Sequence, residues 1–199
     1  MNKRNEKTLR LTVAGMLIAL EIIMAFTPIG YLKIGLLSIT FMTVPVIIGA
    51  VTNGLWMGTV LGLTFGITSF VQCFGMDAFG TTLFGLNPIG TFIMCICTRT
   101  QMGFLCALIY KGLSKTKAPA GVQVGISAFS APFLNTAFFV PCLILFFWKT
   151  EYIQSIAAGA NVLKFIVTLV GVNGVVEWVV CTVVGAAIAL GLKRALKRV

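Results

Sequence analysis

The sequence predicts an all-α membrane protein with six transmembrane helices and both termini in the cytoplasm. Hydrophobic residues make up 58% of the 199 residues and charged residues only 10%, whereas soluble domains carry about a quarter charged residues. The apolar stretches are each close to the ~20 residues that cross a bilayer, and the basic residues gather between or beside them. Lipid is therefore the solvent for most of this surface, and we expect one membrane domain over residues 1–199 without linkers.

Glycines, prolines and charges divide the chain into six predicted spans. Their ranges are 9–29, 35–52, 55–72, 88–110, 119–148 and 163–192. The first follows a basic N-terminus, as a signal peptide would, but it is longer than a normal signal core and carries Glu21, so we expect it to be retained. The second and third spans carry glycines, at a spacing of four from Gly54 through Gly66, which favours close helix packing over ligand contact.

Basic residues form three clusters, at residues 3–10, 111–117 and 193–198. With six spans, all three fall on one side of the membrane, as the positive-inside rule requires for the cytoplasm. The outer side then receives the connections 30–35, 73–87 and 149–161. The second is rich in glycine and phenylalanine, and we expect an irregular loop folded over the mouth of a cavity.

Polar side chains within the later spans are the most informative residues, because a charge near the bilayer centre costs roughly 2.5–3.5 kcal/mol. Arg99 lies in the fourth span, Asn135 and Thr136 in the fifth, and Asn173 and Glu177 one turn apart in the sixth. They predict a polar pocket open to the outside, in which Arg99 faces an anionic group such as a carboxylate. The alternative is structural: Arg99 pairs only with Glu177, and the amides only bond across helices. For Glu21 we favour packing or a partner contact.

The sequence lacks the residues and motifs that several classes of function require. The chain has no histidine, and its six cysteines lack the paired spacing of a zinc site, so we expect no metal. It also has no phosphate-binding loop and no hydrolase motif, which predicts no catalytic residue and no enzyme activity. Because the positive charge flanks membrane spans, we expect no nucleic-acid partner. A binding subunit energised by partner proteins fits these absences best.

Three short segments carry a family resemblance. They are SITFMTVPVIIG at Ser38–Gly49, LNT at Leu134–Thr136 and VNGVVE at Val172–Glu177. In this order, with Arg99 between them, they resemble the substrate-binding S-components of energy-coupling factor (ECF) vitamin transporters. The resemblance implies a multi-pass protein of the prokaryotic plasma membrane, with a six-helix S-component bundle and a vitamin site near the outer side. The substrate-binding residues that it implies are Asn87, Arg99, Asn135, Thr136, Asn173 and Glu177.

The resemblance also implies partners. Small residues four apart on the first helix, here Gly15 and Ala19, would contact a transmembrane T-component joined to two ATPases. These partners would hydrolyse ATP, and the chain itself would hold no cofactor. The Asn-Thr and Asn-Gly-x-x-Glu elements resemble the pantothenate branch, although folate or riboflavin are alternative vitamins. Two other classes remain open: a self-sufficient secondary carrier that uses Glu21 or Glu177 as a proton or cation site, and a membrane enzyme or assembly factor.

Overall fold

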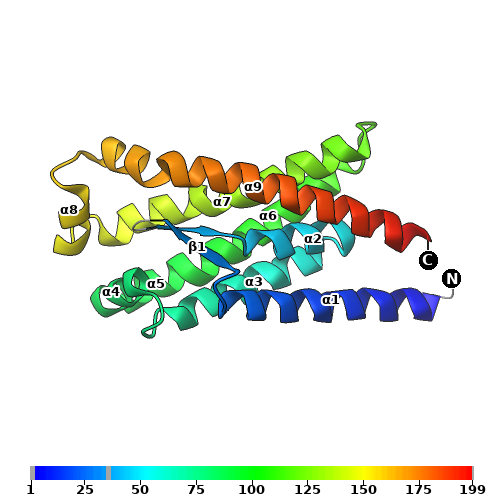
Figure 1. The fold of residues 1–199 in the computed structure, drawn as a ribbon, viewed down its shortest axis with the longest axis horizontal. Coiled ribbons are helices and arrows are strands. Elements are labelled where there is room, and N and C mark those ends of the chain that lie inside the picture. Colours follow the sequence, from blue (N-terminus) through cyan, green and yellow to red (C-terminus); the bar gives the residue numbers. More distant parts are fainter. Residues whose placement is uncertain (1–2, 35–36, 199) are drawn as a thin grey trace.

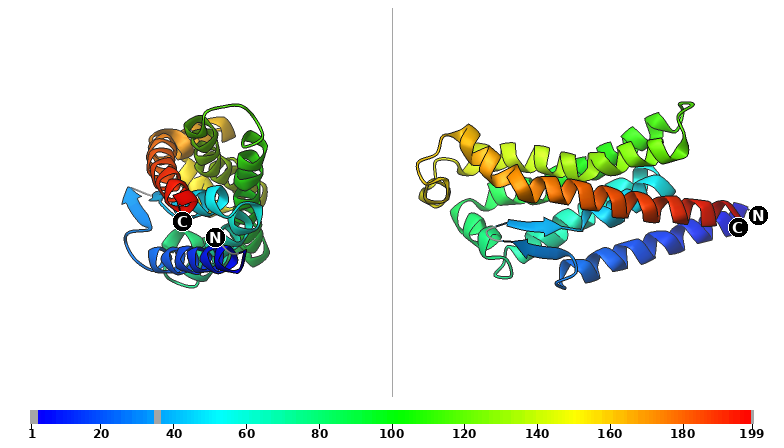
Figure 2. Two further views of the ribbon diagram at one scale, coloured as in Figure 1. Left: turned by 90° about the vertical axis from the view of Figure 1, so that its right-hand side faces the viewer. Right: turned by 45° about the horizontal axis from the view of Figure 1, so that its top comes forward.

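The computed structural model describes residues 3–34 and 37–198, which form an elongated bundle of helices (Figure 1). Both termini lie at one end of the bundle, and the short helices α4 and α8 lie at the other (Figures 1 and 2). In chain order the elements are α1 (Lys3–Ala25), β1 (Tyr31–Ile34), β2 (Leu37–Thr40), α2 (Thr43–Thr52), α3 (Leu55–Gln72), α4 (Ala78–Leu86), α5 (Pro88–Phe92), the π-helix η1 (Ile93–Cys97), α6 (Thr98–Leu113), α7 (Ala120–Phe147), α8 (Glu151–Ala157) and α9 (Val162–Arg198).

Within the described residues, five helices are long and apolar enough to cross a membrane. The segments that meet this test are Thr8–Ala25, Leu55–Gln72, Pro88–Leu113, Ala120–Phe147 and Gly174–Leu196. The third of them is a single run made of α5, η1 and α6. These segments confirm five of the predicted spans, and α3 has the predicted bounds.

The second predicted span, 35–52, is wrong as a full crossing. Its only described helix is α2, which has 10 residues and so extends about 15 Å, half of a ~30 Å hydrocarbon core. Pro45 lies in the first turn of α2. A proline there lacks only an amide that has no helical partner anyway, but its ring would clash with a helical turn before it. The helix therefore begins at Thr43 instead of running on from earlier residues.

A two-stranded hairpin corrects the all-α prediction. Strand β1 pairs antiparallel with β2, and Tyr31 lies opposite Thr40. The segment is rich in aromatic and β-branched residues, which favour extended backbone. Strand β2 also lies against α9, where the Thr40 amide donates to the Glu177 carboxylate over 3.2 Å. That contact joins residues far apart in the chain, so local patterns did not reveal it.

The predicted small-residue packing is confirmed between α3 and α6. A Cβ atom on Gly62 would lie 2.5 Å from the carbonyl oxygen of Arg99, and one on Gly58 would lie 2.7 Å from that of Gly103. Gly66 packs in the same way against the backbone of Ile96 in η1. Because backbone atoms fill the places of these missing side chains, the helices touch without an intervening layer of side chains.

The connections that we predicted on the outer side contain helices that the sequence did not reveal. Helix α4 occupies most of the segment 73–87, for which we expected an irregular loop. Asp77 begins α4 by accepting a hydrogen bond from the Gly80 amide over 2.7 Å, a regular N-cap that offsets the poor helix propensity of the glycines. Helix α8 lies in the segment 149–161, and α9 then kinks at Gly171 (φ −28°, ψ −109°).

Candidate functional site

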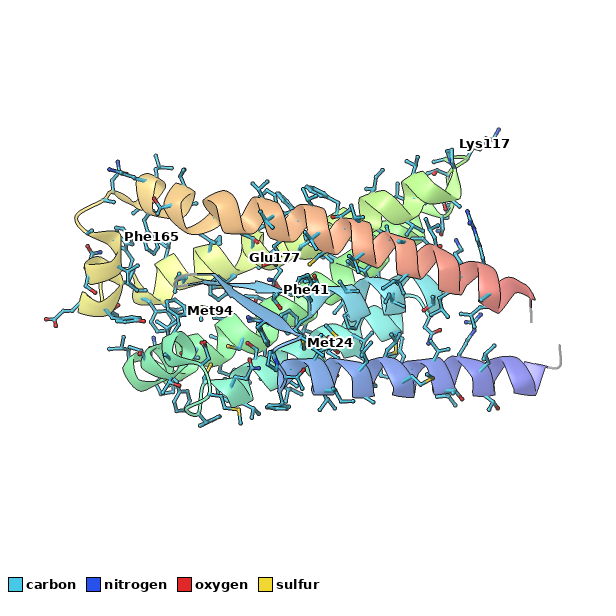
Figure 3. The ribbon with its side chains drawn as sticks, in the orientation of Figure 1. Met24, Phe41, Met94, Lys117, Phe165 and Glu177 are labelled. Carbon is cyan, nitrogen blue, oxygen red and sulfur yellow. The ribbon has the colours of Figure 1, made fainter. Side chains whose placement is uncertain are left out.

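A cavity of about 970 Å³ lies inside the bundle. Its wall comes from the end of α1, the hairpin, α3, α4, η1, α6, α7 and α9. Met94 and Glu177, which both line it, lie near the middle of the bundle, toward the end that carries α4 and α8 (Figure 3). A volume of this size accommodates a vitamin-sized solute.

Arg99 is the cation of this cavity. Its side chain is buried, and Nη1 donates to the carbonyl oxygens of Met94 (3.0 Å) and Cys95 (3.3 Å). The guanidinium carbon lies 4.7 Å from the ring centroid of Phe65 and 5.9 Å from that of Phe139. These carbonyls and rings stabilise the charge without neutralising it, and Nε has no hydrogen-bond partner among the described residues.

The π-helix η1 explains how this arginine finds backbone partners. In a π-helical turn the hydrogen bonds reach one residue further than in an α-helix, so some carbonyls point away from their usual acceptor directions. The Arg99 side chain bonds to the carbonyl of Met94, five residues earlier in the chain. Such turns are frequent at functional sites. The sequence IMCIC alone contained no signal for it.

Glu177 and Asn135 present hydrogen-bond acceptors to the same cavity. Glu177 Oε2 accepts from the Thr40 amide, while Oε1 has no partner in the described part of the chain. The Asn135 side chain lies beside the Glu177 carboxylate. Its Oδ1 is buried and has no hydrogen-bond partner among the described residues. Arg99 and Glu177, both described, form no ion pair within 4.0 Å. Each of the two thus has a backbone partner of its own, and the alternative in which they pair only with each other stays a prediction.

Tyr31 is a cavity residue that the sequence analysis missed. It lies on β1, outside the membrane-spanning segments, and its hydroxyl is buried with no hydrogen bond to any described residue. Burial raises the pKa of this phenol from 10.0 to about 12, so it remains a donor at neutral pH. An amphipathic aromatic residue in an outer connection was the available signal, but only the hairpin shows that it faces the cavity.

Three other predicted substrate-binding residues are placed differently. Thr136 lines the cavity, but its Oγ1 donates to the Pro132 carbonyl (3.2 Å) and accepts from Trp178 Nε1 (3.3 Å), which links α7 to α9. Asn87 is not among the cavity-lining residues, since its Oδ1 caps α5 by accepting from the Gly90 amide over 2.9 Å. Asn173 belongs to α9, and its side chain is outside the part that the structure describes.

Helix α1 has two dissimilar faces. Gly15 and Ala19 are exposed, and a Cβ atom on Gly15 would meet no atom within 4 Å. Leu17 and Glu21 lie on the buried face. Glu21 is fully buried and does not line the cavity, and neither of its carboxylate oxygens has a hydrogen-bond partner among the described residues.

The chemistry of the site is that of binding. It offers a cationic donor in Arg99, acceptors in Glu177 and Asn135, and a phenol in Tyr31, all at the wall of one cavity. Within the described residues, no group of three or more histidine, cysteine, aspartate or glutamate side chains is placed to hold a metal ion. The arrangement suits a solute with an anionic end and several hydrogen-bond donors.

Comparison with known proteins gives two matches. A family model described as the substrate-specific component of ECF transporters matches residues 9–189. A curated relative, the pantothenic acid transporter PanT of Lactococcus lactis subsp. cremoris (strain MG1363), is 28% identical over 167 residues, which covers 78% of this chain and 78% of the relative.

Proposed function

Because the chain belongs to the family of ECF transporter substrate-specific components, we propose that it captures pantothenate in the cavity from outside the cell, for ATP-driven import. It is a multi-pass protein of the cell membrane, and its role is vitamin transport rather than catalysis. The proposal concerns the identity of the vitamin, the residues that bind it, the orientation in the membrane and the partners.

One observation carries the proposal: four buried polar atoms at the cavity wall have no hydrogen-bond partner among the described residues. They are Arg99 Nε, Glu177 Oε1, Asn135 Oδ1 and the Tyr31 hydroxyl. A buried polar group without a hydrogen bond costs ~1–3 kcal/mol. Because these four atoms line one cavity, they favour a solute that supplies the missing hydrogen bonds. Pantothenate offers a carboxylate to Arg99, and its hydroxyl and amide hydrogens are donors for Glu177 and Asn135.

The apolar part of the wall fits the same molecule. Phe65, Phe139 and Val140 line the cavity beside Arg99 and Asn135, and they can cover the branched hydrocarbon centre of pantothenate. Riboflavin has no anionic group for Arg99, whereas folate presents carboxylates and hydrogen-bond donors as pantothenate does, so Arg99 argues against riboflavin alone. The likeness to PanT supports pantothenate from an independent direction.

The proposed orientation places both termini in the cytoplasm. The basic clusters 3–10 and 193–198 lie at the end of the bundle that holds the termini (Figure 1). Lys117, from the cluster at residues 111–117, lies at that same end (Figure 3). One end thus carries all three clusters, which the positive-inside rule assigns to the cytoplasm. The hairpin, α4 and the cavity mouth then face outward.

The proposed partners are a transmembrane T-component and two ATPases, as the family implies. Gly15 and Ala19 lie on the exposed face of α1, where small side chains let another helix approach closely. The chain would bind no ATP itself and hold no cofactor. ATP hydrolysis in the partners would change the exposure of the cavity, while this bundle supplies only the vitamin site.

Binding of pantothenate to the detergent-purified chain tests the proposal. We expect the wild type to retain the vitamin in native mass spectrometry and to bind it in calorimetry. Arg99→Ala should lose ~100-fold or more in affinity, because it removes the partner of the carboxylate. Arg194→Ala is the matched control, since Arg194 is exposed near the C-terminus. Unchanged affinity in Arg99→Ala, or binding of a different vitamin in preference to pantothenate, would overturn the assignment.

A further inference from the structure

Two cysteines meet at the wall of the cavity. Cys73, which ends α3, and Cys95, in η1, have their sulfur atoms 3.9 Å apart. Both residues are buried and both line the cavity. Cys106 and Cys181 are also buried, but they do not line it. The binding role proposed above requires no thiol, so the pair is unexplained by it.

Neighbouring groups hold the Cys73 sulfur in this position. It donates to the Ser69 carbonyl over 3.3 Å, and a Cβ atom on Gly80 of α4 would lie only 2.7 Å from it. The sulfur is therefore enclosed between α4 and η1. To form a disulfide, with its S–S bond of ~2.05 Å, the two sulfurs need to approach each other by about 2 Å, a small movement of two side chains that already face each other.

A disulfide explains the pair better than a metal ion does. Two sulfurs supply only half of a tetrahedral zinc site. Arg99 lies close enough for its charge to act on both thiols, and a nearby guanidinium repels a metal cation. We infer that Cys73 and Cys95 form a reversible disulfide site, which reacts with small disulfides entering the cavity and slows exchange of the bound vitamin.

The reaction is a thiol–disulfide exchange with a soluble disulfide RSSR as the oxidant. One cysteine thiolate attacks RSSR, forms a mixed disulfide and expels RS⁻. The other thiolate attacks the cysteine sulfur of that mixed disulfide and expels the second RS⁻. The two thiol protons end on two molecules of RSH, so RSSR gains two electrons as the cysteine pair loses two. In the proposed orientation the pair lies toward the outside, where disulfides persist.

The bond would connect two parts of the cavity wall that are joined by no covalent link near the site. Cys73 is the first residue of the segment that leads to α4. Met76 and Asp77 of the same segment also line the cavity. Cys95 lies one turn before Arg99, and its carbonyl oxygen accepts from the guanidinium. A crosslink therefore ties the outer segment to the turn that holds the proposed carboxylate partner. This consequence for exchange rests on the proposed function, whereas formation of the bond does not.

The test uses the full-length chain with C97S and C142S. Cys97 is exposed and Cys142 half-buried, and neither lines the cavity, so their removal limits side reactions. After treatment with hydroxyethyl disulfide and alkylation of the remaining thiols, peptide mass spectrometry should find a crosslinked Cys73–Cys95 peptide that a reductant separates. Mixed adducts alone, or a crosslink that involves Cys106 or Cys181, would overturn the site. This readout requires no vitamin, so it fails independently of the proposed function.

The effect on exchange is measured on the same sample before and after reduction. We expect release of bound pantothenate to be about tenfold slower in the oxidised protein, because the crosslink restricts opening of the wall, and to recover on reduction. The additional variants C73S and C95S should show no oxidant effect. Equal release rates in the oxidised and reduced protein, with the crosslink present, would overturn the proposed effect on exchange.

Discussion

Helix α3 takes part in two regions that differ in kind. Along the glycine interface, formed by Gly58, Gly62, Gly66 and Gly103, it touches α6 and η1 backbone to backbone. At the cavity, Phe65 of α3 packs against Arg99, and both side chains line space that a solute can occupy. The first region contributes backbone contact that stabilises the folded protein, and its glycines do not line the cavity. The second leaves buried polar atoms of the cavity wall without hydrogen-bond partners among the described residues. The first region therefore serves stability, and the second serves binding.

The largest expected effect is on the glycine interface. Gly62→Val should lower the free energy of unfolding by about 3 kcal/mol, because its Cβ would lie 2.5 Å from the Arg99 carbonyl oxygen, a backbone atom that cannot swing aside. Thermal unfolding in detergent, followed by tryptophan fluorescence, measures it. Gly112→Ala is the control, since nothing lies within 4 Å of its added Cβ, and it should stay within ~0.5 kcal/mol. Equal effects of both substitutions would break the comparison.

The next effect concerns affinity instead of stability. Glu177→Gln keeps an oxygen for the Thr40 amide and replaces the partnerless Oε1 by a donor that faces the donors of the ligand. We expect pantothenate to bind ~10- to 100-fold more weakly, with an unchanged midpoint of thermal unfolding in the absence of ligand. Calorimetry and the same fluorescence assay separate these two quantities. A loss of stability equal to that of Gly62→Val would place Glu177 in the structural region.

Two separate substitutions on α7 compare an oxygen that lacks a hydrogen-bond partner with one that has two. Asn135→Ala should weaken binding about tenfold, because Oδ1 has no hydrogen bond in the described structure. Thr136→Val should change affinity less than about threefold, since its hydroxyl already bonds to Pro132 and Trp178. If Thr136→Val were the more damaging of the two, the hydrogen bonds would be a poor guide to ligand contact.

The smallest expected effect is at Glu21, the buried carboxyl outside the cavity. Glu21→Met should raise the free energy of unfolding by up to ~1 kcal/mol, because it removes a buried carboxyl that has no hydrogen bond to the described residues from a face shared with Leu17 and Met24. Pantothenate affinity should not change. In proteoliposomes with the partner subunits, uptake should continue without a proton gradient. Gradient-driven uptake by the chain alone, lost in Glu21→Met, would favour a secondary carrier.

The part of the fold that could be predicted depends on local properties. The bounds of α3 and the close packing of Gly58 and Gly62 followed from apolar length and glycine spacing, because each residue's preference for lipid or for a helix interface is mostly its own. The hairpin was missed, since an apolar stretch of this length is compatible with either a helix or strands. Pro45 is a signal for the start of α2, but the sequence did not show that a strand, and not a helix, comes before it.

The candidate site was predicted in part. Arg99, Asn135, Thr136 and Glu177 were selected as polar residues in apolar spans, and the structure brings all four to one cavity wall. Asn87 was selected through the family resemblance alone, and the structure uses it to cap α5. Tyr31 was overlooked, because a tyrosine in a connection gives no sign of the direction in which it points.

The sequence by itself determined that this protein is embedded in a membrane and where along the chain its positive charge gathers. It also determined which polar residues need hydrogen-bond partners within the membrane. These properties depend on the transfer of each segment from water to lipid. Only the tertiary structure decided that Arg99 bonds to the carbonyls of a π-helical turn, that Glu177 meets Thr40, and that Cys73 meets Cys95. The contacts of Glu177 and of Cys73 join elements distant in the chain, and the free energy of all three contacts depends on packing geometry that no local pattern specifies.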